Sequence, residues 1–284
     1  MYLRLFKELL FSIYKCYDIN MFHQAKKSMG QNFLKSKEAL NMMCVAGEVN
    51  DKDIVIEIGP GKGALTEKLL EKARKVIAIE KDSDLVEIIN ERFTNEIKNK
   101  KLILLNEDIL NFNPGNFNIK EGEYKIIANI PYNITGLIIR RFLSECIKPI
   151  SMTLLVQKEV AERIVARDGK ESILSLSVKA YGNPKYVMKV HKRFFSPSPK
   201  VDSAIIHIGN ISNKFFKDIN EENKFFRIVK AGFAHKRKVL RKNLEEIKEN
   251  INKIDQILIK LDINPKARAE DIKFEKWIEM NKLF

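Results

Sequence analysis

The sequence has few cysteines and histidines, and neither residue type is clustered. Its 284 residues include three cysteines and four histidines. No two cysteines have the CxxC spacing that is typical of zinc sites and redox motifs, and an odd, scattered set argues against a disulfide framework. The histidines are equally scattered, so the sequence gives no support to a metal-dependent mechanism. We therefore predict that no metal takes part.

Long hydrophobic runs are also missing. No apolar segment reaches the roughly 18–20 residues that a membrane-spanning helix needs. Residues 1–20 are apolar and aromatic, but Arg4, Lys7, Glu8 and Lys15 interrupt them, which is unlike the hydrophobic stretch of a signal peptide. We treat residues 1–20 as an N-terminal extension of unclear role, with a translation start at Met21 as the alternative. We expect a cytoplasmic protein that has no membrane partner.

Acidic residues are scarce relative to basic ones. Lysine and arginine number 51 against 37 aspartates and glutamates, which gives a formal net charge of +14. Two segments, residues 179–201 and 224–244, contain no acid at all while carrying several lysines and arginines. Such a balance favours nucleic acid as the partner, because basic side chains track phosphates. The alternative is compositional bias and a solvated helix face.

Apolar segments of strand and helix type alternate along the first part of the chain. Strands are predicted at residues 53–58, 76–79, 102–105, 124–128 and 152–157, and helices at 64–73, 84–93 and 135–144. This alternation is typical of an α/β fold with a mainly parallel sheet that is covered on both faces. The fold class we predict is therefore a Rossmann-like α/β sheet.

The second part of the chain has a different pattern. Residues 173–180, 186–190 and 203–208 are predicted as further strands added to the sheet, and residues 210–223 as a linker. Residues 224–284 are predicted to be all-helical, with an apolar stripe at Val239, Leu240, Leu244 and Ile247. We expect one domain over residues 21–209 and a small C-terminal all-helical domain over residues 215–284.

Four glycine or polar residues follow successive predicted strands. Gly59, Glu80, Asp108 and Asn129 each come at or just after the carboxyl end of a strand. In open α/β sheets, ligands bind outside the carboxyl ends of the strands. We therefore expect these four residues to converge on one ligand site.

The first chemical motif is Glu-Ile-Gly-Pro-Gly-Lys-Gly-Ala at residues 57–64. Its glycines, Gly59 and Gly61 foremost, allow a tight strand-to-helix turn and a close approach of a ligand to the main chain. Glu80 lies 21 residues beyond Gly59, where a carboxylate can accept hydrogen bonds from ribose hydroxyls. The same spacing satisfies the dinucleotide form G-x-G-x-x-G/A, so these residues alone leave a dinucleotide oxidoreductase open.

The third strand is followed by Asp108. A carboxylate at this place can accept a hydrogen bond from an adenine amino group, while the neighbouring Ile109 covers the ring. An isolated aspartate would more often be a turn former. Together with Gly59 and Glu80, Asp108 completes a predicted adenosine pocket.

The fourth strand leads into Asn-Ile-Pro-Tyr at residues 129–132, and this tetrad decides the predicted chemistry. The amino group of adenine is a poor nucleophile because its lone pair is conjugated with the ring. The side-chain oxygen of Asn129 and a main-chain carbonyl can hold the amino hydrogens and favour the tetrahedral nitrogen that attacks a methyl group. Pro131 fixes the backbone, and Tyr132 offers a face for stacking the base, worth roughly 1–3 kcal/mol. A plain Asn-X-Pro turn is the alternative.

A last motif, Phe-Phe-Ser-Pro-Ser-Pro-Lys-Val-Asp-Ser, occupies residues 194–203. Its two prolines predict an extended loop. We assign Phe194 to the core and Phe195 to the opposite wall of a slot for a flipped base, because enzymes that modify a base must take it out of its stack. The alternative is that both phenylalanines belong to the core.

Taken together, these motifs resemble the ribosomal RNA adenine dimethyltransferase family. Lys-Ser-Met-Gly-Gln-Asn-Phe-Leu at residues 27–34 looks like its N-terminal signature, and the resemblance runs from about residue 24 to the C-terminus. It implies a class I methyltransferase that uses S-adenosyl-L-methionine. The positions that the resemblance assigns to the cofactor are Asn32, Leu34, Gly59, Gly61, Glu80, Asp108 and Asn129. It also places Phe195 against the target base, beside Asn129, Pro131 and Tyr132.

The family has two branches, one acting on two adjacent adenines of small-subunit rRNA and one on a large-subunit adenine. The sequence is similar to the first at residues 59–66, 199–204, 231–238 and 268–270. The resemblance implies dimethylation of 16S rRNA adenines in a 3′-terminal hairpin. It further implies a role in small-subunit biogenesis, with the immature small subunit as the partner of a monomer. Lys62, where an apolar residue is common, is a departure that the other branch shares.

Two functions from other classes remain as alternatives. A dinucleotide oxidoreductase would require an acid or base beside a hydride-transfer site, and the sequence offers none. An RNA-binding assembly factor, or a transcription factor derived from this fold, would not need Glu80, Asp108 and the tetrad of residues 129–132 intact. The methyltransferase is therefore the function that we predict.

Overall fold

The computed structural model describes residues 26, 30–247 and 250–284. The extension of residues 1–20, the start at Met21 and the first residues of the N-terminal signature, 27–29, lie outside the described residues. Among the described helices, none is long and apolar enough to cross a membrane. No group of three or more histidine, cysteine or carboxylate side chains within the described residues is placed to hold a metal ion.

By its internal contacts the chain divides into two compact units. The first consists of the described part of Met1–Gln157 together with Val187–Ile205. The second consists of Lys158–Tyr186 together with Ile206–Phe284.

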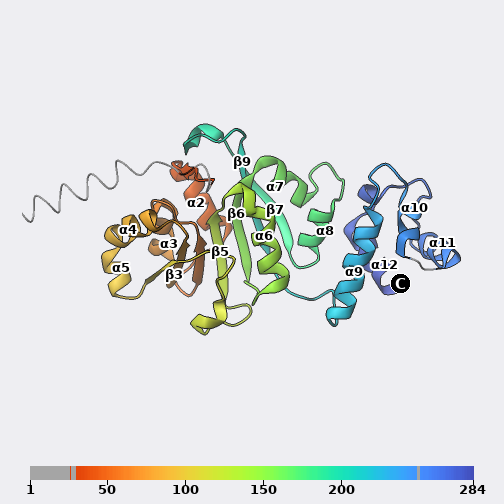
Figure 1. Cartoon of the computed structure of the whole chain (residues 1–284), viewed down its shortest axis with the longest axis horizontal. Helices are drawn as coiled ribbons and strands as arrows, with labels where there is room; N and C mark the ends of the chain where they lie inside the picture. Colours follow the sequence, from red (N-terminus) through yellow and green to blue (C-terminus); the bar gives the residue numbers. More distant parts are fainter. Residues whose placement is uncertain (1–25, 27–29, 248–249) are drawn as a thin grey trace, which may run out of the picture. The chain divides into compact units, whose positions relative to one another are not determined.

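A seven-stranded sheet has the order β4-β3-β2-β5-β6-β9-β7, and it confirms the predicted α/β sheet (Figure 1). Its strands are β2 (Ile54–Ile58), β3 (Lys75–Glu80), β4 (Leu102–Asn106), β5 (Tyr124–Asn129), β6 (Ser151–Gln157), β7 (Asn183–Val190) and β9 (Ser203–Gly209). The pairs β2–β3, β2–β5, β3–β4 and β5–β6 are parallel. Their central strands are almost continuously apolar, as strands buried on both faces of a parallel sheet must be.

The register of the parallel strands aligns their carboxyl ends. Ile58 pairs with Ile79, Glu80 pairs with Asn106, and Asn129 pairs with Leu155. The residues that follow β2, β3, β4 and β5 therefore emerge along one edge of the sheet, which is the place where such folds bind ligands.

In the sequence, the first helix of this unit precedes β2 and the others lie between these strands. They are α2 (Lys37–Ala46), α3 (Ala64–Lys72), α4 (Ser83–Arg92), α5 (Thr94–Lys98) and α6 (Thr135–Arg140). All of them except α5 bury apolar side chains; in α3, for example, Leu65, Leu69 and Leu70 are buried. A short π-helical segment, Arg141–Glu145, continues α6, so the helix predicted over residues 135–144 is confirmed with a change of winding at its end.

A second, two-stranded sheet joins two motifs that are distant in the sequence. Strand β1 (Phe33–Leu34) pairs antiparallel with β8 (Phe195–Ser196), and the main-chain N–H of Lys35 donates to the carbonyl of Phe194 at 2.8 Å. The N-terminal signature is thereby attached to the proline-containing loop.

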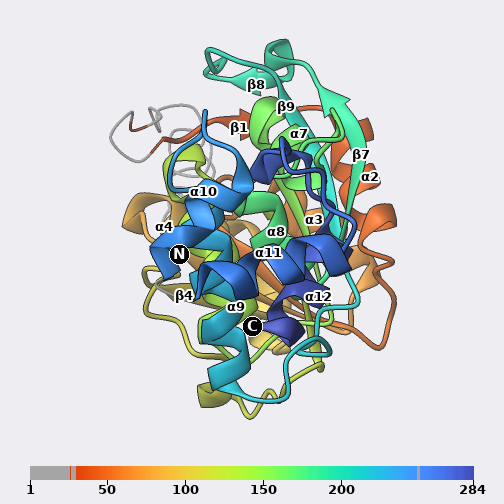
Figure 2. The ribbon, with the colours of Figure 1, turned by 90° about the vertical axis from the view of Figure 1, so that its right-hand side faces the viewer.

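The helices of the second unit are labelled in Figures 1 and 2. They are α7 (Lys158–Val165), α8 (Ile173–Lys179), α9 (Ile219–Gly232), α10 (Leu240–Leu244), α11 (Ile251–Lys260) and α12 (Phe274–Leu283). Trp277 of α12 is fully buried; its indole N–H donates to the carbonyl of Ile272, and its ring stacks on Phe233. Among the described residues of 224–284, every regular element is a helix, as predicted.

The strand predicted over residues 173–180 is wrong, because these residues form helix α8. Apolar residues alternate with serines here, and this period of two resembles a strand. Ser172 caps the helix instead: its hydroxyl accepts from the N–H of Ser175, whose hydroxyl accepts from the N–H of Ser172. This reciprocal capping box favours the helix over the strand.

The linker predicted over residues 210–223 is too long, because α9 already begins at Ile219. Asp218 caps this helix by accepting hydrogen bonds from the N–H groups of Asn220 and Glu221. The first turn of α9 is polar and acidic, and acidic side chains interact favourably with the positive end of the helix dipole. Because this turn has no apolar periodicity, the sequence pattern did not predict it as helix.

Candidate functional site

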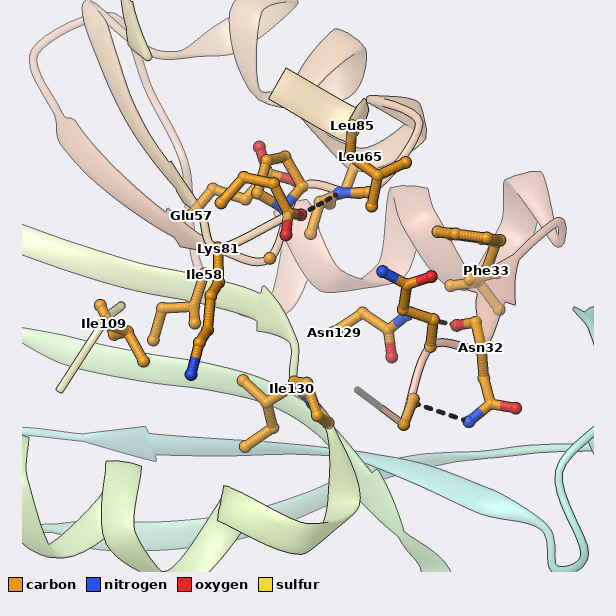
Figure 3. Close-up of a pocket in the computed structure, with 18 of the residues that line it drawn as sticks. Asn32, Phe33, Glu57, Ile58, Leu65, Lys81, Leu85, Ile109, Asn129 and Ile130 are labelled. Atoms are coloured by element: carbon orange, nitrogen blue, oxygen red, sulfur yellow. Dashed lines mark hydrogen bonds between the residues drawn. The ribbon is translucent and has the colours of Figure 1, made fainter. Parts of the chain in front are cut away.

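A cavity of about 720 Å³ lies at the carboxyl edge of the parallel strands in the first unit. A volume of this size is typical of pockets for small molecules and cofactors. The predicted site residues that line it are Asn32, Leu34, Gly59, Gly61, Glu80, Asp108, Asn129, Pro131 and Tyr132. Figure 3 shows Lys81 and Ile109 toward one end of the pocket and Asn32 toward the other, with Asn129 and Ile130 between them.

The turn after β2 allows a ligand to approach the main chain closely. Gly59 and Gly61 have φ angles of 63° and 60°, which side-chain-bearing residues rarely adopt. A Cβ atom on Gly61 would lie 2.9 Å from a ring carbon of Phe33, whereas one on Gly59 would meet no atom within 4 Å. Gly61 is therefore required by packing, and Gly59 leaves open space beside the main chain where a ligand can approach.

Glu80 joins the end of β3 to this turn. One carboxylate oxygen accepts from the N–H of Gly61 at 3.2 Å, and the other accepts from the N–H of Asp82 at 2.9 Å. The side chain is buried, and burial raises the pKa of Glu80, although these main-chain donors oppose the rise. Each oxygen keeps a second lone pair, so Glu80 can also accept from a pair of ligand hydroxyls.

Asp108 lies at the neighbouring strand end. One of its oxygens accepts from the N–H of Leu110 at 3.0 Å, and the other accepts from the ammonium of Lys81 at 2.9 Å. These contacts hold the pKa of Asp108 below its usual value, with the Leu110 N–H as the larger cause. An ionised carboxylate only accepts hydrogen bonds, which is the property needed to bind an amino group.

The orientation of the Asn129 amide is fixed from a distant segment. Its Nδ2 donates to the main-chain carbonyl of Asn32 at 3.1 Å, and Nδ2 of Asn32 donates to the carbonyl of Gly30 at 3.0 Å (Figure 3). Because only the nitrogen end of an amide can donate, the carbonyl of Asn32 determines which way the Asn129 amide faces. Its oxygen is left as an acceptor at the cavity.

Tyr132 follows in a short 3₁₀ turn, Tyr132–Ile134, after Pro131. Its phenol oxygen lies 2.6 Å from the hydroxyl of Ser203 at the start of β9. Burial raises the pKa of the phenol, so Tyr132 stays neutral at ordinary pH. Its ring is half-buried and lines the cavity.

Comparison with known proteins decides the family. The model of the ribosomal RNA adenine dimethylase family matches residues 22–284. The chain belongs to this family. Its sheet with a glycine-rich turn after β2 is accordingly the Rossmann-like methyltransferase fold, and family membership excludes the oxidoreductase alternative.

Individual relatives and solved structures agree with this family. A Dehalococcoides mccartyi protein named ribosomal RNA small subunit methyltransferase A is 40% identical over 258 residues, covering 89% of this chain and 86% of its own. A protein of the same name from Fusobacterium nucleatum is 40% identical over 266 residues, covering 91% and 97%. A dimethyladenosine transferase from Plasmodium falciparum superposes with a TM-score of 0.73 at 28% identity, covering 88% and 98%. The 23S rRNA methyltransferase ErmE shares the fold, with a TM-score of 0.75 at 24% identity and 88% and 98% coverage.

Phe195 is the one predicted site residue that does not line this cavity. Its side chain is 4% exposed and belongs to the core cluster that also contains Leu34 and Val190. Strand β8 pairs Phe195 with Leu34, which turns the ring inward, whereas the next residue, Ser196, lines the cavity. Phe194, which we assign to the core, is partly buried and packs against the same cluster, and the guanidinium of Arg193 covers its ring. The inward position of Phe195 follows from strand alternation, which the proline-rich sequence conceals.

Sequence reasoning gave no role to Glu57, although it lines the cavity. Glu57 is 1% exposed, and its Oε2 has no hydrogen-bond partner within the described residues. Burial raises its pKa to about 8. An acid inside the otherwise apolar strand β2 was the available signal, because burying a carboxylate is costly.

In each of the two basic segments, two lysine or arginine side chains are in ion pairs within the described residues. In the first, Lys179 pairs with Glu171 and Lys189 with Asp202. In the second, Arg241 makes a two-pronged contact with Asp255, and Lys242 pairs with Glu245. Lys236, Arg237 and Lys238 are exposed, and none has an ion-pair partner within the described residues. This loop is therefore the densest cluster of available positive charge in the two segments.

Proposed function

We propose that this protein transfers methyl groups from S-adenosyl-L-methionine to N6 of two adjacent adenines, twice per base, in the 3′-terminal hairpin of 16S small-subunit rRNA. The observation that carries the proposal is the amide of Asn129, whose nitrogen is engaged by Asn32 and whose oxygen is left as an acceptor beside the cavity. The names of the relatives at 40% identity support the small-subunit target.

The residues of the cavity fit this cofactor. Glu80 has lone pairs available for ribose hydroxyls, and Asp108 can accept from an adenine amino group. Gly59 leaves open space, and Asn32 and Leu34 line the other side. The unpartnered oxygen of Glu57 indicates that a polar or cationic ligand group completes this site, which agrees with the amino group of a methionine moiety. When bound, the cofactor supplies an electrophilic methyl group on a sulfonium.

Asn129 would prepare the target nitrogen for attack. Its Oδ1, with a main-chain carbonyl near Pro131, accepts the two N6 hydrogens and draws the lone pair out of conjugation with the ring. The N6 nitrogen would take up the methyl group that the bound cofactor supplies, and one N6 proton would leave to solvent. A buried histidine base is not needed, and none of the described histidines lines this cavity.

Tyr132 would hold the base that is taken out of its stack. Its half-buried ring, at the end of the tetrad, offers a face on which either of two adjacent adenines can stack.

The exposed loop of Lys236, Arg237 and Lys238 would contact RNA phosphates. Binding of this kind weakens steeply as salt rises, because each neutralised phosphate releases a counterion. Replacing all three residues by glutamine should lower the slope of log K against log salt by about three, roughly one for each contact. Replacing the three ion-paired residues Lys179, Lys189 and Arg241 should change the slope less. Equal changes in both variants would show that the loop is not a docking surface.

The proposed substrate implies a role in assembling the small ribosomal subunit, with the immature subunit as the partner of a monomeric enzyme. It also agrees with the cytoplasmic location expected from the sequence. We propose, as before, that residues 21–209 contain the methyltransferase site and that residues 215–284 assist RNA docking.

Transfer of labelled methyl groups tests the proposed substrate. Unmethylated small-subunit particles and naked large-subunit rRNA are each incubated with the protein and labelled cofactor. We expect label on N6 of two adjacent adenines of small-subunit rRNA. Label on large-subunit rRNA alone would contradict the target, and label on neither would contradict the activity.

A further inference from the structure

We infer that Ser203 is a positioning residue that holds the ring of Tyr132 in place for the target base. This inference rests on the proposed function, since it assigns Tyr132 to the base. Ser203 itself does not line the cavity and would touch neither base nor cofactor. It acts through the contact between its hydroxyl and the phenol of Tyr132.

The contact is short and well protected. The two oxygens are 2.6 Å apart, at the strong end of the range for hydroxyl hydrogen bonds. Ser203 is 0% exposed, so water does not compete for its hydroxyl. Within the described residues this is the only hydrogen bond made by the Tyr132 side chain. Whichever oxygen donates, the phenol end of the ring has one anchor.

The anchor lies on a rigid part of the fold. Ser203 is the first residue of β9, which is bordered on both sides by other strands of the sheet. The preceding residue, Asp202, accepts hydrogen bonds from the N–H of Lys192 at 3.0 Å and from the ammonium of Lys189 at 2.8 Å. These contacts tie the base of the loop that carries the Phe-Phe-Ser-Pro-Ser-Pro motif, so the hydroxyl of Ser203 has a fixed position.

Tyr132, in contrast, belongs to a short turn rather than to a strand. Pro131 fixes the backbone just before it, with φ −58°, and the turn ends at Ile134. A ring attached there at one end keeps rotamer freedom, whereas a ring held at both its Cα and its phenol oxygen projects in one direction. A fixed ring lets a stacked base present N6 to Asn129 repeatedly in the same geometry, which two successive methylations of a base require.

A double-mutant cycle tests the inference with the full-length protein. Ser203→Ala, Tyr132→Phe and the double variant are assayed for methyl transfer to small-subunit particles. Each single variant should lower kcat about tenfold, the effect of one lost positioning hydrogen bond. The double variant should lose no more than either single variant, because both changes remove the same contact. KM for RNA and the Kd of S-adenosylhomocysteine should change less than twofold. The melting temperature should change by about 2 °C at most.

Ser151→Ala is the matched control. Ser151 is also a buried serine at the first residue of a strand, β6, but it pairs with Lys125 at the end of the sheet opposite the cavity. Its loss should leave kcat unchanged. A Ser203→Ala kcat equal to that of the wild type, or losses that multiply in the double variant, would overturn the inference. A fall in kcat accompanied by an equal weakening of cofactor binding would show a merely structural role. An inactive wild-type protein would instead contradict the proposed function itself.

Discussion

The two halves of the cavity are built in different ways. The half that we propose for the cofactor, called the cofactor half below, is formed by main-chain turns that directly follow β2, β3 and β4, and its carboxylates are held by nearby N–H groups, as Glu80 is by Gly61 and Asp82. The half that we propose for the target base is called the base half. The base half is held by side-chain hydrogen bonds between distant segments, from Asn129 to Asn32 and from Tyr132 to Ser203. The first half depends on local sequence, and the second depends on the fold bringing three motifs together.

Asn129→Ala should give the largest effect, and it should be confined to the base half. Removing the acceptor for N6 should lower kcat by about 10²–10³-fold, the usual cost of losing one group that stabilises a transition state. Single-turnover methylation, RNA binding and cofactor binding are measured in parallel. RNA binding that falls as far as kcat would contradict the role of Asn129 in positioning N6.

Glu80→Ala should affect the cofactor half. It removes the acceptor for ribose hydroxyls and the tie to the glycine turn, so the Kd of S-adenosylhomocysteine should rise about 10–100-fold, as for lost hydrogen bonds to a charged group. Calorimetry measures this Kd, and Glu67→Ala, an exposed acid on α3, is the control. The RNA affinity should not change; if it falls with the cofactor affinity, the two halves are not separable.

Glu57→Gln should change the pH dependence of stability. The folded pKa of about 8 lies above the ordinary value of 4.5, so the folded state holds this proton more tightly. The free energy of unfolding of the ligand-free protein therefore decreases as the pH rises from about 4.5 through about 8. Glutamine has no proton to lose, so the melting temperature of the variant should gain on that of the wild type between pH 5 and pH 8.5. If the melting temperatures of the two proteins change with pH by the same amount, Glu57 is not protonated in the folded state.

Lys81→Met should give the smallest effect. The ammonium of Lys81 occupies one oxygen of Asp108, and Lys81 is exposed, so its ion pair is weak and screened by salt. Removing it leaves an ionised Asp108 for the adenine amino group and should tighten cofactor binding about twofold to threefold at low salt. Titrations at low and high salt check this, because the gain should vanish at high salt. Weaker binding would mean that the stem of Lys81 instead covers the adenine.

The sequence placed Gly59, Gly61, Glu80 and Asp108 at one site, and all four line the cavity, because the information for these strand ends is local. A strand, a glycine turn and a helix occur within residues 54–72, and the period of two or 3.6 residues identifies each element. Where the pattern misled, a capping interaction was stronger than periodicity: Ser172 turned residues 173–179 into a helix, and Asp218 began α9 within the expected linker.

Sequence alone therefore determined the fold class, the family resemblance and the positions of Gly59, Glu80, Asp108 and Asn129, since these follow from short-range patterns that repeat at every strand end. Only the tertiary structure decided which of two adjacent phenylalanines faces the core, which amide end of Asn129 faces the cavity, and that Ser203 holds Tyr132. These outcomes depend on partners 71 or 97 residues away for the two hydrogen bonds, and on the register of β1 against β8 for Phe195. No local propensity encodes a contact at such separations; it exists only once the chain has packed.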